Sequence, residues 1–298
     1  MREEYCSNLP RADARSTAFS GGAFGIRRRV GVTTPILSAA ALCTAVLGVG
    51  LVAVVSGPAH AGPLDEAAER YRACLIQNVD RTVASVRKLH ASIAVNDLDG
   101  AKKAWIDARI GWERSEVFTS GFVPELDKEI DAWPDGLVGF QAIEAKLFGA
   151  SGTGVGSEVD ALLSSLSELG KIVRKIKLTP QGLLNGVARL AYEVGESKVD
   201  GGESRLSGTS IDDMRNNVDG IDLAYRTIFA SAIETRDGQL AAEVQRGINV
   251  LKTMLEVRDL RRLDPDRLRA VSEELVVTLQ NAALRIDLAR PALEGSVQ

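Results

Sequence analysis

Apolar residues recur every three or four positions over most of the chain beyond residue 62, which is the pattern of amphipathic helices. The first such stretch begins at Pro63 and is ended by Asn96-Asp97. No segment shows the strict alternation that is typical of a half-buried strand. The sequence therefore predicts an all-α fold. The apolar positions of the first helix are Ala68, Tyr71, Leu75, Val79, Val83, Val86 and Ile93.

Turn and capping residues divide the remaining sequence into further helices. Thr179-Pro180 is a typical helix entry, with threonine as the cap and proline at the first helical position. We place a boundary there and predict two antiparallel helical bundles, residues 62–177 and 178–298, of about four helices each. The further helices are expected near residues 100–119, 137–148, 158–176, 180–195, 210–233, 237–257 and 265–290.

Residues 1–61 have the pattern of an export signal. Three arginines at 27–29 precede the apolar, uncharged residues 32–56, and Ala59-His60-Ala61 forms a cleavage pattern. We predict cleavage after Ala61 and a periplasmic or extracellular protein, exported by the twin-arginine or the general route. The alternative is a retained membrane anchor, because the apolar stretch is long enough to span. Cys43 is a poor lipid-attachment site, since a leucine precedes it.

The composition after this segment excludes several classes of protein. It holds 30 basic and 37 acidic residues, a net charge of −7, which argues against nucleic-acid binding. One histidine, His90, and one cysteine, Cys74, remain. A Ser-His-Asp hydrolase or a zinc site with several histidines is therefore unexpected. A lone cysteine also predicts no disulfide within the mature chain.

Charged residues lie on the apolar face of the helix expected near residues 100–119. Arg109, Glu113 and Glu116 are linked by steps of three and four to Trp105 and Trp112. If the tryptophans face inward, these charges must be paired or bound to a metal, because an isolated buried charge is too costly. The alternative is a partly exposed Arg109–Glu113 pair with Glu116 in water.

Two other helices repeat this feature. Gln141 and Glu144 align with Phe148, and Glu193 shares a face with Leu190. Inward carboxylates from several helices are the way in which a helical bundle builds a site for a hard metal ion. Iron, manganese, calcium and magnesium all suit such oxygen-rich sites.

These same segments resemble the EfeO and imelysin-like family, in the same order along the chain. No single motif is decisive, but the ordered set covers essentially all of the chain after residue 61. The shorter form of this family, with only the helical domain and no cupredoxin domain, is the expected match. The resembling segments are residues 104–116 (AWIDARIGWERSE), 126–131 (LDKEID), 139–144 (GFQAIE), 185–186 (NG), 192–194 (YEV), 197–205 (SKVDGGESR) and 216–220 (NNVDG).

The resemblance implies a two-bundle helical fold and an extracytoplasmic protein that binds an iron ion, or another hard divalent cation. Gln141 stands where the family has histidine, so it offers only an amide oxygen and is expected to contribute weakly or from behind the ligands, while Arg109 orients a carboxylate. The implied metal ligands are Glu113, Glu116, Asp131, Glu144 and Glu193.

By the same resemblance, the expected partners are a membrane iron permease and a Dyp-type haem peroxidase. Three alternatives remain. A site that has lost tight iron binding would leave a protein that binds another hard cation. An acidic polysaccharide is a second possible ligand, although the net charge opposes it. A metallopeptidase is disfavoured, because a zinc peptidase needs nitrogen ligands that His90 alone does not supply.

Overall fold

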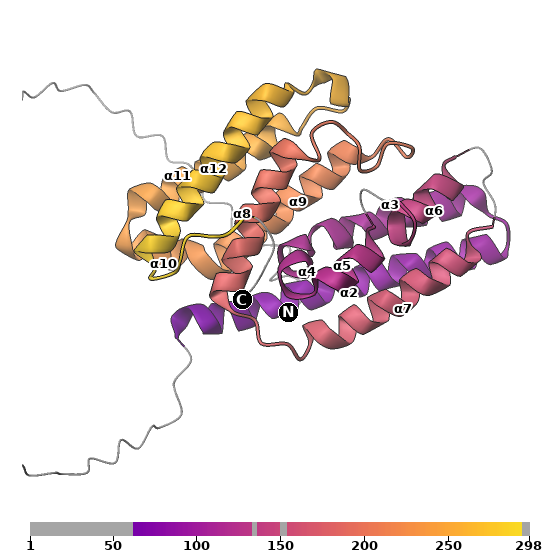
Figure 1. Ribbon diagram of the computed structural model, residues 1–298, viewed down its shortest axis with the longest axis horizontal. Helices are drawn as coiled ribbons and strands as arrows, with labels where there is room; N and C mark the ends of the chain where they lie inside the picture. The colour runs from indigo at the N-terminus through magenta and orange to yellow at the C-terminus, as the bar shows by residue number, and fades with distance from the viewer. Residues whose placement is uncertain (1–61, 133–135, 150–153, 294–298) are drawn as a thin grey trace, which may run out of the picture. The chain divides into compact units, whose positions relative to one another are not determined.

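The computed structural model describes residues 62–132, 136–149 and 154–293, and within these ranges it contains helices and no strand (Figure 1). The predicted all-α fold is confirmed. The predicted signal, with Cys43 and the cleavage site, lies outside the described residues. Among the helices that the structure describes, none has the length and apolar character needed to cross a bilayer.

The first helices of the chain gather around α2. Figure 1 shows the long helix α2 (Pro63–Ala94) running between α3 (Leu98–Glu113) and α7 (Gly156–Val173), and α2 contacts both. Three short helices follow α3 before α7 begins: α4 (Glu116–Phe122), α5 (Pro124–Ile130) and α6 (Gly139–Leu147).

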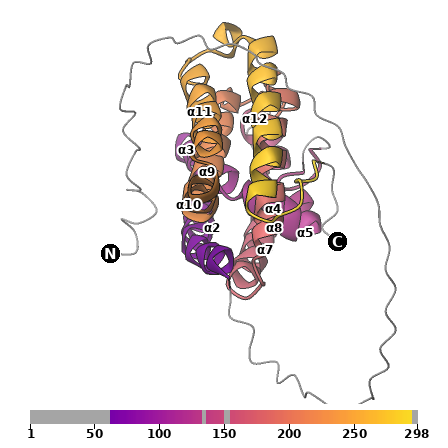
Figure 2. The ribbon, with the colours of Figure 1, turned by 90° about the vertical axis from the view of Figure 1, so that its left-hand side faces the viewer.

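The later helices gather around α8 (Pro180–Glu196) and α12 (Pro265–Arg285), which pack against each other. Figure 2 shows α11 (Gly238–Met254) alongside α12, and the two are in contact. Contacts also join the two groups of helices, since α4 packs against α8 and α3 packs against α9 (Ser210–Ala224). The division into two bundles at residue 178 stays a prediction.

Side-chain caps fix several helix starts. Thr179 Oγ1 accepts a hydrogen bond of 3.2 Å from Gly182 N, and Pro180 opens α8, as the sequence predicts. Asp97 caps α3 in the same way, accepting from Gly100 N at 2.9 Å. These caps satisfy backbone donors that have no partner inside the helix.

Two predicted helices are interrupted. The helix expected over 100–119 breaks at Arg114-Ser115, where the Ser115 hydroxyl donates to Gly111 O at 2.8 Å and competes with the helical ladder. The helix expected over 210–233 contains a π-helical turn, Tyr225–Phe229, before α10 (Ala230–Arg236). At this turn the Tyr225 hydroxyl donates to Ala241 O at 3.0 Å.

Glycines bring the helices that carry the acidic residues close together. A Cβ added to Gly186 on α8 would lie 1.9 Å from Val117 O on α4. A Cβ on Gly111 of α3 would lie 2.5 Å from Asn78 O on α2. Any larger residue would therefore force these backbones apart. The glycines hold α3 and α4 against their neighbours, and these two helices carry Glu113 and Glu116.

Cys74 on α2 corrects one expectation. It is buried and disulfide-bonded, and its partner lies outside the described residues. The prediction of no disulfide is wrong for the full chain, because it counted cysteines only after the expected cleavage.

Candidate metal centre

Arg109 on α3 is buried and meets four carboxylates. Its Nη2 atom lies 3.0 Å from Glu203 Oε1 and 3.3 Å from Asp213 Oδ2. It also pairs with Glu113, one turn further along α3, and with Asp131, which directly follows α5. The guanidinium therefore cross-links α3, the end of α5, the loop of residues 197–209 between α8 and α9, and α9 itself.

The burial of this group separates two readings of the sequence. Arg109 is 1% exposed, Glu113 is fully buried and Glu116 is 8% exposed. Trp105 and Trp112 are buried on the same helix. The Arg109–Glu113 pair forms, but the alternative of a partly exposed pair with Glu116 in water is wrong. The charges lie inward and are paired, as a buried charge requires.

Lys198, on the 197–209 loop, is the second buried cation. Its Nζ lies 2.7 Å from Glu116 Oε2, 3.3 Å from Glu113 Oε2 and 3.1 Å from Glu203 Oε2. The residue is 6% exposed. A single ammonium group therefore contacts three carboxylates that come from α3, α4 and the loop.

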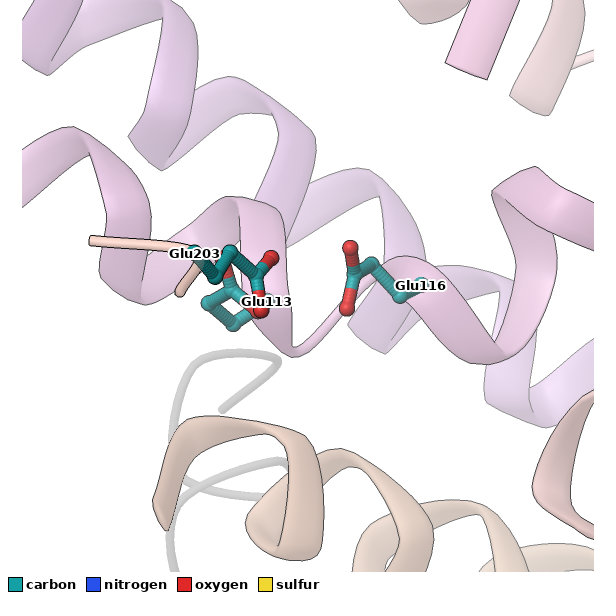
Figure 3. A group of neighbouring side chains, drawn as sticks. All are labelled: Glu113, Glu116 and Glu203. Carbon is teal, nitrogen blue, oxygen red and sulfur yellow. The ribbon is translucent and has the colours of Figure 1, made fainter. Parts of the chain in front are cut away.

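Glu113, Glu116 and Glu203 form what we call the glutamate triad. One oxygen from each lies within 4.8 Å of the other two, and all three residues are buried. Figure 3 shows the Glu113 and Glu203 carboxylates side by side, with Glu116 facing them. Asn217 Nδ2 on α9 donates to Glu113 Oε2 at 2.8 Å and to Glu116 Oε2 at 2.7 Å, which holds these two carboxylates together.

The acidic groups around the two cations outnumber them. Burial raises the pKa of Glu116 to about 8 and that of Asp213 to about 6, and it raises the pKa of Glu113 well above its usual range. Burial also acts on Glu203, but Lys198 and Arg109 outweigh it and lower its pKa. Some of these carboxyls therefore hold protons near neutral pH, which is what an excess of buried negative charge produces.

Comparison with known proteins identifies the family. The model described as Peptidase M75: Imelysin matches residues 67–138 and 136–285, which is most of the chain. The chain belongs to the imelysin family. The resemblance to EfeO and imelysin-like proteins is confirmed.

The relatives share a theme in their names. The "Efem/EfeO family lipoprotein" of Staphylococcus haemolyticus is 28% identical over 65% of this chain and 70% of its own length. The "Iron uptake system component EfeM" of Pseudomonas syringae pv. syringae is 27% identical over the same shares. The "Iron uptake system component EfeO" of Yersinia pseudotuberculosis is 28% identical, and the match spans 53% of that protein.

The other ligands expected from the imelysin resemblance take different positions. Asp131 pairs with Arg109 and so adjoins the triad. Glu144 is 4% exposed and accepts hydrogen bonds from Ser207 on the loop. Glu193 pairs with Arg189 at 2.7 Å, and its side chain is 26% exposed. Gln141 is 9% exposed, and its Nε2 has no hydrogen-bond partner among the described residues.

Four residues of the centre are missing from the sequence-based ligand set. Glu203 and Lys198 lie on the 197–209 loop, where no helical period shows which side chains face inward. Asp213 and Asn217 lie on α9, whose apolar stripe we used only to define the helix. The available signal was the family resemblance of residues 197–205 and 216–220, which includes three of the four.

Proposed function

We propose that this imelysin-family protein binds iron, or another hard cation, at the glutamate triad and serves outside the cytoplasm as a component of an iron-uptake system. The observation that carries the proposal is the buried convergence of Glu113, Glu116 and Glu203 within 4.8 Å. The relatives named as iron-uptake components supply the physiological context.

The chemistry of the triad fits this cargo. Carboxylate oxygens are the ligands that iron in helical bundles, manganese and calcium take readily. A metal ion between the three carboxylates would relieve their mutual repulsion and displace the protons that burial retains. Copper binding should be weaker than in a site with histidine, since every side chain of the triad offers oxygen.

The wider ligand set combines the structure with the family resemblance. Asp131 adjoins the triad through Arg109, which supports its inclusion. Glu144 and Glu193 remain proposed ligands from the resemblance, with Gln141 as a weak contributor. For Glu144 or Glu193 to ligate together with the triad, its present partner, Ser207 or Arg189, would have to release it.

The location and partners follow from the same comparison. An extracytoplasmic site agrees with the signal pattern of residues 1–61 and with a relative named as a lipoprotein. A membrane iron permease and a haem peroxidase of the Dyp type are the proposed partners.

We propose no enzymatic role, despite the word peptidase in the family description. His90 is the single histidine of the described residues. Its Nε2 lies 3.2 Å from Asp160 Oδ1, with its side chain 49% exposed, on helices other than those of the triad. Casein should remain uncleaved by the purified protein in the presence of zinc.

Metal titration tests the proposal. Apo-protein should melt at a higher temperature with Mn²⁺, Ca²⁺ or, under anaerobic conditions, Fe²⁺, because binding to the folded state stabilises it. Glu113→Gln should remove this shift. Glu273→Gln, at an exposed position of α12, is the matched control and should keep it. The absence of any metal-dependent shift in the wild type would refute the proposal.

A further inference from the structure

The Lys198 ammonium lies at the position that a metal ion would take. It contacts one oxygen of each member of the glutamate triad, at 2.7 Å, 3.1 Å and 3.3 Å. A hard metal ion bound by the same oxygens would lie about 2.0–2.6 Å from them. Two cations cannot both lie among these oxygens, since their separation would be less than the sum of their radii and their charges repel.

We propose that Lys198 is a tethered competitor of the metal, which must leave the triad before an ion can bind there. This inference rests on the proposed function and adds the residue that sets the affinity and charge selectivity of the site. A cation of charge one gains nothing by replacing an ammonium group. An ion of charge two or three gains in proportion to its charge, so the lysine favours the more highly charged ion.

The placement of Lys198 also links loading to the 197–209 loop. Lys198 and Glu203 lie on this loop, so the competitor and one ligand share a segment five residues long. Lys198 N donates to Glu193 O at 3.0 Å, which anchors the start of the loop to α8. The Glu144–Ser207 hydrogen bonds anchor its far end at 2.7 Å and 2.8 Å. Departure of the ammonium therefore changes the loop between two fixed points.

Substitution tests the competition. Lys198→Met removes the ammonium and keeps an unbranched apolar stem of similar length. Calorimetric titration should show that this variant binds Mn²⁺ at least about tenfold more tightly than the wild type, because no cation has to be displaced. Lys252→Met is the matched control. Lys252 also contacts two carboxylates, Asp219 at 3.2 Å and Asp222 at 2.7 Å, but neither belongs to the triad, and its affinity should equal that of the wild type.

The outcomes separate this inference from the proposed function. If the wild type binds Mn²⁺ and Lys198→Met binds it equally or more weakly, the inference is overturned and the proposed function stands. If neither binds, both are overturned. Tighter binding in Lys198→Met but not in Lys252→Met supports both.

A measurement on the wild type covers the case in which Lys198→Met fails to fold. Acylation of lysines by a water-soluble succinimidyl ester, read by peptide mass spectrometry, reports the access of reagent to each amine. Lys198 should react slowly in apo-protein and severalfold faster at saturating Mn²⁺, whereas Lys252 should be unchanged. Equal acylation of Lys198 with and without bound Mn²⁺ would overturn the inference.

Discussion

Ser207 holds Glu144 by two hydrogen bonds, from its backbone nitrogen at 2.8 Å and from its hydroxyl at 2.7 Å. Glu144 lies on α6 and Ser207 lies near the end of the 197–209 loop, 63 residues away in sequence. The carboxylate therefore fastens the loop that carries Lys198 and Glu203. Loop order and the geometry of the glutamate triad depend on this contact.

Removing the Ser207 hydroxyl should loosen the loop. Ser207→Ala leaves the backbone hydrogen bond to Glu144 and should destabilise the protein by about 1 kcal/mol, the usual net value of one hydrogen bond. Hydrogen–deuterium exchange should rise in residues 197–209. The control is Ser167→Ala, whose hydroxyl donates within exposed α7 to Leu163 O at 2.6 Å. Unchanged exchange in the loop would contradict the anchoring role.

Arg109 should be the most sensitive charged position. Arg109→Met leaves four buried carboxylates without their shared partner, and breaking such a buried network costs about 3–5 kcal/mol. Urea denaturation followed by circular dichroism measures the loss. Arg261→Met is the control, since Arg261 is 89% exposed and pairs only with its neighbour Asp259, and it should leave the midpoint unchanged. Equal midpoints for the two variants would contradict the cross-linking role of Arg109.

The stability of the metal-free protein should fall as pH rises from about 5 to about 8. Burial raises the pKa of Glu116 from 4.5 to about 8, so the folded state holds this proton more tightly than the unfolded state. That contribution is fully present below the unfolded pKa and is lost as pH rises through the folded pKa. Asp213, with a pKa raised by burial to about 6, acts in the same direction.

Glu116→Gln tests this assignment. The amide does not titrate, so urea denaturation in the presence of a chelator should show a smaller decline in the free energy of unfolding across the same pH range. A residual slope from Asp213 should remain. If the variant and the wild type lose stability equally between about pH 5 and pH 8, another group carries the effect.

The helical period located the part of the centre that lies on helices. Trp105 and Trp112 showed which face of α3 is inward, and Glu113 followed from its spacing. Glu116 was placed correctly even though the helix breaks at Ser115, because the break occupies only two residues. Periodicity carries no such information in the 197–209 loop. The inward positions of Lys198 and Glu203 depend on tertiary contacts with α3, α4 and α9, which single-sequence patterns do not encode.

The contrast between Glu203 and Glu193 separates the ligand set of the triad from the set expected from sequence. Glu203 is 3% exposed and contacts Lys198 at 3.1 Å, so Glu203→Gln removes a charged ligand from the middle of the site. We expect this variant to lose the thermal shift produced by Mn²⁺. Glu193 lies outside the triad and is held by Arg189 at 2.7 Å, so Glu193→Gln should keep most of the shift. The two variants make the same chemical change, which matches them as a pair in differential scanning fluorimetry. If Glu193→Gln abolishes the shift and Glu203→Gln retains it, the metal lies nearer α8 than the triad, and the ligands implied by the family resemblance describe the site better than the triad does.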